Sequence, residues 1–272
     1  MKKTGIWLTS LLMITLLITG CGGGTNASKD GGKKTVVKVA ASSTPSGEIL
    51  NHLKPALAKE GVELQIVEMS DYIKPNLALS DKEVDANLFQ HKPYLDKFVA
   101  DRGLKLSAVA DLYLAPLRVY SKQVKNLADL PAGAIIAIPN DPTNGGRALL
   151  VLEQAGLIKL REGAGLQATA RDIVENPKNI KIKEIEAPQL PRSLDDVGAA
   201  VINTNYAVQA GLKPTQDAIF SEQSTSPYVN VLVVRTGDEN RPEIQKLIAA
   251  LKSPESRKFI ETTFSGTIIP VF

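Results

Sequence analysis

From Thr35 onward, short β-branched segments alternate with longer segments whose apolar residues recur at helical spacing. Segments 35–41 and 134–138 are typical of buried strands. A C-terminal segment instead carries its apolar residues on one helical face: Ile244, Leu247, Ile248 and Leu251. Alternation of this kind along a chain predicts an α/β fold with largely parallel sheets.

The same patterns predict the bounds of further elements. Strands are expected at 62–66, 180–186, 199–202 and 229–234, and helices at 94–102, 145–155, 242–251 and 254–263. Caps and breakers mark the ends of these elements. Thr44-Pro45 is expected to begin a helix that Gly61 ends, Thr143 or Asn144 to cap the helix at 145–155, and 193–196 to form a capping box.

The N-terminus is typical of a secretory signal over residues 1–20. Lys2-Lys3 precede an apolar run at 6–18 that is short for a membrane span, and small residues precede Cys21. The segment 17–21 resembles the lipobox of bacterial lipoproteins, in which the thiol is acylated before cleavage. We therefore expect Cys21 to carry diacylglycerol and acyl chains such as palmitate, anchoring the chain on the extracytoplasmic face of the cell membrane. The alternative is a free cysteine behind an ordinary signal.

Cys21 is the only cysteine, so this chain cannot form an internal disulfide. Segment 21–35 is rich in Gly, Ser, Asn, Asp and Lys, which predicts a flexible tether. Removing a 20-residue signal from 272 residues leaves enough chain for two modest domains.

Composition argues against several classes of function. The formal charge of +3 includes Lys2 and Lys3 and forms no basic stripe, so we expect no nucleic-acid partner. Two histidines are too few for a histidine-based metal site. Residues 163–168 satisfy a loose dinucleotide pattern without its strand–turn–helix context, so no cofactor is expected. Nucleophile motifs are absent and the chain is not expected to be an enzyme, although carboxylates paired by folding remain open.

The most informative loop is 139–147, between a predicted strand and a predicted helix. Two glycines would let a ligand approach the backbone, and Arg147 lies in the first turn. Free N–H groups at a helix start favour an anion, and a guanidinium can hold a carboxylate with two charge-assisted bonds. The loop therefore predicts a carboxylate ligand; an ordinary turn with a surface arginine is the alternative.

A second cluster, at 85–94, gathers Phe89, His91 and Tyr94 in a chain with 5% aromatic residues. These rings could line an apolar slot, and a thioether packs well against aromatic edges. The other interpretation places Phe89 and Tyr94 in the core and makes His91 a partly exposed cap.

Several long segments resemble the NlpA/MetQ family of methionine-binding lipoproteins, the solute receptors of methionine ABC importers. They cover most of the mature chain in the family's order: Asp71-Tyr72 with Pro75-Asn76, 85–95, 138–147, 174–179, 186–196, 199–207 and 226–230.

The resemblance implies an α/β fold of the periplasmic-binding-protein type, type II-like, with two lobes joined by two crossover segments. Lobe 1 would comprise 36–115 plus 229–272, and lobe 2 would comprise 116–228. The ligand would lie between the lobes.

The resemblance also implies the roles of single residues. Arg147 would bind the ligand carboxylate, with Asn144 beside it. Asn203 or Asn205, together with Asn230, would fix the amino and carboxylate groups. The wall around the thioether would be formed by Tyr72, Phe89, His91 and Tyr94, with His91 packing and hydrogen bonding without transferring a proton.

The implied function is capture of methionine, with L-methionine the leading choice, and delivery to an ABC permease whose partner ATPase hydrolyses ATP. D-methionine, a methionine-containing dipeptide or another apolar amino acid are alternative ligands. A different class of function, a surface lipoprotein for adhesion or assembly, predicts no saturable small ligand.

Overall fold

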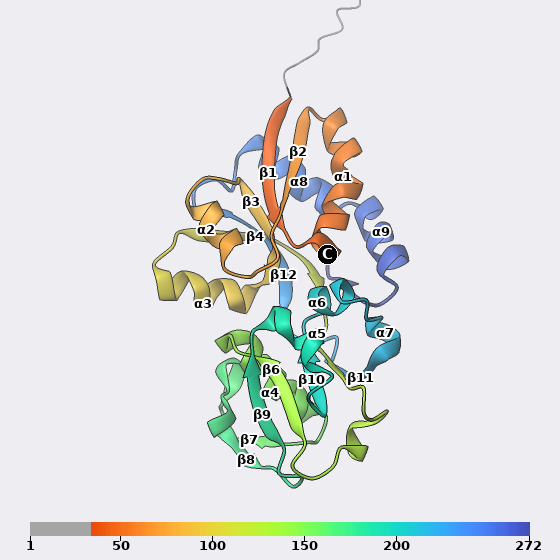
Figure 1. The fold of residues 1–272 in the computed structure, drawn as a ribbon. Coiled ribbons are helices and arrows are strands. Elements are labelled where there is room, and N and C mark those ends of the chain that lie inside the picture. The colour runs from red at the N-terminus through yellow and green to blue at the C-terminus, as the bar shows by residue number, and fades with distance from the viewer. Residues whose placement is uncertain (1–33) are drawn as a thin grey trace, which may run out of the picture. The chain divides into compact units, whose positions relative to one another are not determined.

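The computed structural model describes residues 34–272, which form an α/β fold with two lobes, each built on its own sheet (Figure 1). The predicted signal, Cys21 and the tether up to residue 33 lie outside the described residues. Thr35, placed at the end of the tether by the sequence, is already the first residue of a strand. The fold class predicted from the sequence is confirmed.

The first sheet has six strands in the order β13-β4-β12-β3-β1-β2. Their bounds are β1 (Thr35–Ala41), β2 (Val62–Glu68), β3 (Ala86–His91), β4 (Leu106–Leu114), β12 (Val229–Arg235) and β13 (Ile269–Pro270). The second has five, in the order β11-β5-β10-β6-β9. Their bounds are β5 (Arg118–Tyr120), β6 (Ile135–Pro139), β9 (Lys181–Ile185), β10 (Ala199–Ile202) and β11 (Ala218–Ser221). A separate pair joins β7 (Lys159–Leu160) to β8 (Ile173–Glu175).

The chain passes between the two sheets twice. The first crossover segment, 115–117, runs from β4 to β5, and the second, 222–228, runs from β11 back to β12. Because β12 re-enters the first sheet from the other lobe, it lies antiparallel to β3 and β4, whereas β1 is parallel to β2 and β3. The sheets are therefore mixed, and the expectation of largely parallel sheets was wrong.

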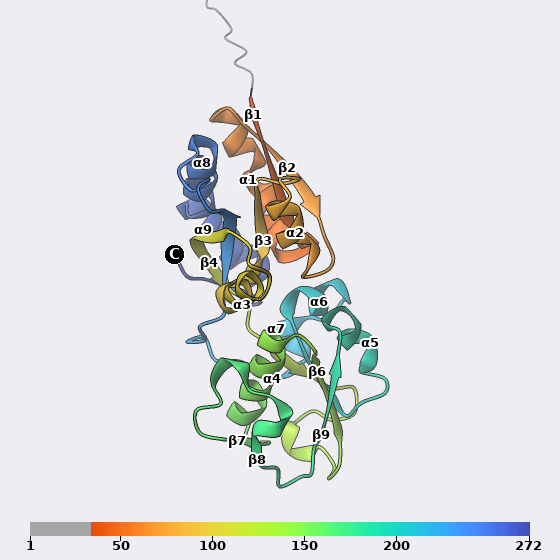
Figure 2. The ribbon, with the colours of Figure 1, turned by 90° about the vertical axis from the view of Figure 1, so that its left-hand side faces the viewer.

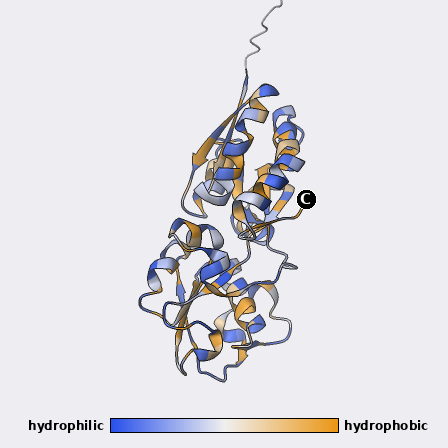
Figure 3. Cartoon of the chain, turned by 90° about the vertical axis from the view of Figure 1, so that its right-hand side faces the viewer, coloured by the Kyte–Doolittle hydropathy of each residue, from blue (hydrophilic) through white to orange (hydrophobic). Residues whose placement is uncertain are grey.

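Helices cover both faces of the first sheet. Their bounds are α1 (Glu48–Lys59), α2 (Lys74–Ser80), α3 (Lys92–Arg102), α8 (Pro242–Leu251) and α9 (Pro254–Phe264). One core lies between α1, α8 and α9 and alternate strand residues such as Val39 and Leu232. A second lies under α2 and α3 against Ala40 and Val233, which point the opposite way because strand residues alternate. Figure 2 shows the helices of this lobe around its strands. Figure 3 shows apolar stretches along the strands and on the helices that cover them.

The second lobe carries α4 (Pro142–Gln154), α5 (Leu190–Ser193), α6 (Thr204–Gln209) and α7 (Pro214–Asp217). Helix α4 packs Ala148, Leu149, Val151 and Leu152 into a core with β6 and β10. None of the helices in the described part of the chain combines the length and apolar character needed to cross a bilayer.

Most predicted elements are present, but three predicted caps were wrong. Helix α1 begins at Glu48, and Thr44 has extended backbone angles and a hydroxyl without a hydrogen-bond partner among residues 34–272. Helix α4 is capped by Asp141, whose carboxylate accepts the N–H of Asn144, so Thr143 and Asn144 lie inside its first turn. Ser193 ends α5 and its hydroxyl donates back to Leu190, so it caps nothing that follows.

Candidate functional site

The residues singled out in the sequence meet around one cavity. The free volume left inside this cavity is about 30 Å³, well below the roughly 300–1,000 Å³ common for small-molecule sites. The cavity is lined by Tyr72, Phe89, Gln90, His91, Tyr94, Ala115, Asn144, Arg147, Asn203, Thr204, Asn205 and Asn230. Every ligand-binding candidate from the sequence is among them; Gln90, Ala115 and Thr204 are additional.

Both lobes and a crossover contribute to the lining. The segment before α2, together with β3, α3 and β12, supplies Tyr72, Phe89, His91, Tyr94 and Asn230. Helix α4 supplies Asn144 and Arg147, and the start of α6 supplies Asn203, Thr204 and Asn205. Ala115 belongs to the first crossover. The cavity therefore exists only when the two lobes are brought together.

Aromatic rings form one side of the cavity. The centroid of Tyr72 lies 6.0 Å from that of Phe89 and 6.0 Å from that of Tyr94, and Phe89 and Tyr94 meet edge to face at 6.2 Å. Tyr206, which sequence reasoning missed, lies 5.0 Å from Tyr72 and donates to Ser70 O. Tilted rings at these separations make a stable apolar wall.

His91 joins the aromatic side to the polar side. Its Nδ1 accepts the N–H of Tyr94 and caps α3, so in the neutral ring Nε2 carries the proton and donates to Asn144 Oδ1 at 3.2 Å. Burial, followed by the nearby positive charge of Arg147, lowers the pKa of His91 to about 3. His91 is thus a neutral, buried cap, in contrast to the partly exposed one considered from sequence.

The start of α4 is occupied by a protein carboxylate. Asp141 accepts from the backbone N–H of Asn144 at 2.9 Å and from its side-chain amide at 3.1 and 3.0 Å. This arrangement turns Asn144 Oδ1 toward Asn203 Nδ2, at 2.8 Å, as well as toward His91. The expectation that free N–H groups at this helix start bind a ligand anion was wrong for Asn144, because Asp141 already uses its N–H.

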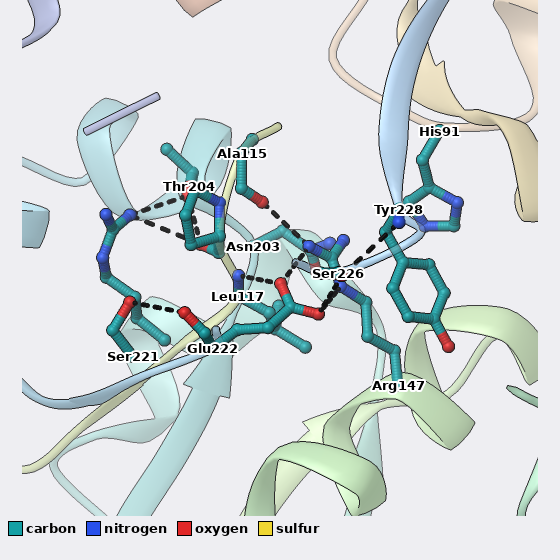
Figure 4. A network of polar contacts seen from close by, with 12 residues as sticks. His91, Ala115, Leu117, Arg147, Asn203, Thr204, Ser221, Glu222, Ser226 and Tyr228 are labelled. Carbon is teal, nitrogen blue, oxygen red and sulfur yellow. Dashed lines mark hydrogen bonds and ion pairs between the residues drawn. The ribbon is translucent and has the colours of Figure 1, made fainter. Parts of the chain in front are cut away.

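Arg147 is 2% exposed and is held by Glu222 (Figure 4). Its Nε donates to Glu222 Oε1 at 2.9 Å, and its Nη2 donates to Glu222 Oε2 at 2.5 Å and to Ala115 O at 2.9 Å. The two charge-assisted bonds expected for a ligand carboxylate are thus made to a carboxylate of the chain itself. Within residues 34–272, Nη1 has no hydrogen-bond partner.

Sequence reasoning missed Glu222. The residue lies in a polar segment, Glu222-Gln223-Ser224-Thr225-Ser226, that is indistinguishable from a surface loop. In the structure its side chain is 3% exposed. A buried acid can be identified from sequence only when its cationic partner is known, and Arg147 is 75 residues away.

The asparagines differ in what they offer to a ligand. Asn205 Oδ1 already accepts the hydroxyl of Tyr72 at 2.6 Å. Asn203 donates through Nδ2 to Asn144, whereas its buried Oδ1 has no partner among the described residues. A buried acceptor without a donor is costly, so Asn203 Oδ1 is ready for a donor that enters the cavity.

Metal and proton-transfer chemistry find no support here. No group of three or more His, Cys, Asp and Glu side chains in residues 34–272 is placed so that it could hold a metal ion. The low pKa of His91 makes it a poor proton acceptor at neutral pH. The arrangement is suited to binding a small zwitterion with an apolar tail.

Comparison with known proteins agrees with the family predicted from the sequence. The model of the NlpA lipoprotein family matches residues 37–272. The D-methionine-binding lipoprotein MetQ of Escherichia coli K12 is 46% identical over 257 residues, covering 94% of this chain and 93% of that protein.

Two solved structures are also similar. A nutrient binding protein from Burkholderia cenocepacia bound to methionine has a TM-score of 0.84 at 48% identity, covering 87% of this chain and 100% of that one. A periplasmic substrate-binding protein of an ABC transporter from Coxiella burnetii has a TM-score of 0.83 at 44% identity, covering 86% and 100%. The chain therefore belongs to the NlpA lipoprotein family.

Proposed function

We propose that this chain captures methionine between its two lobes and delivers it to an ABC importer. The observation that carries the proposal is the chemistry of the cavity. Among residues 34–272, Arg147 Nη1 and the acceptor Asn203 Oδ1 have no hydrogen-bond partner, and aromatic rings line the same cavity. A free amino acid with an apolar side chain has the complementary pattern.

In the proposed binding mode, Arg147 Nη1 donates to the ligand carboxylate and Asn203 Oδ1 accepts from its ammonium group. A hydrogen bond to a charged group contributes about 1.5–3 kcal/mol. Asn230 and Asn205 border the same space and supply side-chain amides to the amino and carboxylate groups. Asn144 orients Asn203 from behind.

The thioether packs against Tyr72, Phe89, His91 and Tyr94. Sulfur–aromatic contacts contribute about 0.3–1.5 kcal/mol each. The neutral state of His91 suits this role, because a charged ring beside an apolar tail would have to be desolvated.

Delivery requires the two lobes to open and close about the two crossovers. One lobe comprises 36–115 together with 229–272, and the other comprises 116–228. The closed receptor would dock on a permease, while ATP is hydrolysed by the partner ATPase. In this proposal the chain binds and releases its ligand unchanged and catalyses no reaction.

Anchoring completes the proposal. Acylation of Cys21 would hold the receptor on the extracytoplasmic face of the cell membrane, with the following segment as a tether. A Cys21→Ser variant is expected to lose incorporation of labelled palmitate and to appear in the soluble fraction. Undiminished labelling of that variant would rule out this anchor.

The names of relatives favour a second ligand. The Escherichia coli relative is called a D-methionine-binding lipoprotein, so D-methionine is the alternative to L-methionine, ahead of a methionine-containing dipeptide. Native mass spectrometry first identifies any ligand carried through purification. Calorimetry then compares five ligands: L-methionine, D-methionine, glycyl-methionine, norleucine and leucine. Absence of saturable binding to all five would overturn the proposed function and favour an adhesion or assembly lipoprotein.

A further inference from the structure

Glu222 lies outside the cavity lining, in the second crossover, yet it joins this crossover to the first (Figure 4). Its backbone N–H donates to Leu117 O at 2.9 Å, and its Oε2 accepts the N–H of Leu117 at 2.9 Å. Main chain and side chain of one residue thus hold the two connecting segments together.

The same carboxylate fixes the orientation of Arg147. Two parallel bonds, Nε to Oε1 and Nη2 to Oε2, define the plane of the guanidinium, and a third bond from Nη2 reaches Ala115 O in the first crossover. A planar fork held along one edge cannot rotate without breaking both bonds. Nη1 is therefore the edge left for the cavity.

All the groups that contact the Glu222 carboxylate are donors. Arg147 Nε and the hydroxyl of Ser226 bond to Oε1, and Arg147 Nη2 and Leu117 N bond to Oε2. A glutamine here would have to place its NH₂ group against N–H donors at one of the two positions. The site therefore requires a carboxylate for its geometry as well as for its charge.

We infer that Glu222 is the positioning residue of the site: it aims Arg147 Nη1 into the cavity and links the ligand's carboxylate to both crossovers, without touching the ligand. This inference rests on the proposed function, in which Arg147 binds that carboxylate. From charge alone, Glu222→Gln would be expected to strengthen methionine binding, because removing an anion beside Arg147 would increase the attraction of Arg147 for an anionic ligand. The positioning role predicts weaker binding instead.

The test is calorimetry with methionine and with methioninol, which lacks the carboxylate. Glu222→Gln is expected to weaken methionine binding by about 10-fold or more and to leave methioninol binding unchanged. In an Arg147→Ala background the same substitution should have no further effect, because Glu222 acts through Arg147. Ser226→Ala, which removes a bond to Glu222 but none to Arg147, is the matched control and should bind methionine within about 3-fold of the wild type.

A thermal melt of each variant first establishes folding. If Glu222→Gln does not fold, Glu222→Asp is measured in its place. Aspartate keeps the charge but is too short to keep both bonds to Arg147, so the same loss of methionine affinity is expected. Equal losses for both ligands, a loss that persists without Arg147, or methionine affinity at or above the wild-type value would each overturn the positioning role.

The binding data distinguish a failure of the proposed function from a failure of the role of Glu222. A wild-type chain that does not bind methionine overturns the function, and the role of Glu222 falls with it. A wild-type chain that prefers methionine to methioninol while Glu222→Gln keeps that preference overturns only the role of Glu222.

Discussion

The hydroxyl of Tyr72, in the lobe built on the first sheet, donates to Oδ1 of Asn205, on α6 of the other lobe, at 2.6 Å. The two lobes are covalently joined only through the crossovers within residues 34–272, so this bond spans the cavity on the side of the aromatic wall. Nearby, Tyr206 donates to Ser70 O at 3.0 Å. Each of these two phenols thus donates a hydrogen bond from one lobe to the other.

Tyr72→Phe is expected to keep the wall and lose the bond to Asn205. A neutral hydrogen bond contributes about 0.5–1.5 kcal/mol, so methionine affinity should fall about 2- to 12-fold, mainly through faster dissociation. Stopped-flow fluorescence measures this rate. Tyr113→Phe, which loses a bond to Ser46 inside one lobe, is the control and should leave dissociation unchanged.

Arg147→Ala is expected to weaken methionine binding by roughly 10- to 150-fold, because one charge-assisted bond is lost. It should also lower the free energy of unfolding by about 3–5 kcal/mol, because Glu222 would remain buried without its partner. Calorimetry and urea denaturation measure the two effects. The exposed Arg161→Ala should change neither, and an unchanged methionine affinity in Arg147→Ala would remove Arg147 from the site.

Asn203→Ala is expected to reduce the affinity for methionine about 10-fold, since in the proposed binding mode its Oδ1, unpartnered within residues 34–272, accepts from the ammonium group. The affinity for 4-(methylsulfanyl)butanoic acid, which has no amino group, should change much less. Competition calorimetry with both ligands gives the two values. Equal losses of affinity for the two ligands would mean that Asn203 shapes the cavity and does not bind the ammonium group.

His91 makes stability depend on pH. Its pKa is about 3 in the folded chain against 6.5 in the unfolded one, so between these values the unfolded chain binds the extra proton. The free energy of unfolding should therefore fall as pH drops below 6.5, by up to about 1.4 kcal/mol per pH unit for this group. Urea denaturation from pH 4 to 7 should show a smaller decline in His91→Asn than in wild type. An unaltered slope in His91→Asn, or the same reduction in His52→Asn, would contradict this assignment.

Gly146 is needed because α4 packs closely on the segment that follows it. A Cβ at this position would lie 2.6 Å from Leu166 O and 3.0 Å from Ala168 N. Gly146→Ala is expected to destabilise the chain by about 1–3 kcal/mol, measured by chemical denaturation. Gly145→Ala, whose Cβ would meet only Pro139 O at 3.0 Å, should cost less. A neutral effect of Gly146→Ala would show that the segment around 166–168 can move away.

Much of the fold could be predicted from local patterns. The strands at 35–41 and 199–202 and the helix at 242–251 have the predicted bounds, because the strands are short β-branched or apolar runs and the helix carries its apolar residues on one face. Strand β3 was missed, because both of its faces are buried and it mixes polar with apolar residues: Asn87 and Gln90 hydrogen bond with Asn76 of α2.

The residues that line the cavity could be predicted, but the contacts that hold them in place could not. Long segments similar to one family pointed to Arg147, the asparagines and the aromatic wall, and the structure places all of them around one cavity. Their ligand-binding roles stay predictions. Glu222 and Tyr206 carry no local pattern that separates them from ordinary loop and helix residues.

Local sequence patterns account for most of the helices and strands and for the side chains available to the site, because hydrophobic periodicity and turn residues act over a few neighbouring positions. How those side chains are partnered across the site depends on the folded chain: Tyr72 with Asn205, Asn144 with Asn203, and Glu222 with Arg147. Hydrogen bonds and charges in a dry interior depend on distances of a few ångströms. Such distances between residues as far apart as 72 and 205 exist only after the two lobes have folded and met.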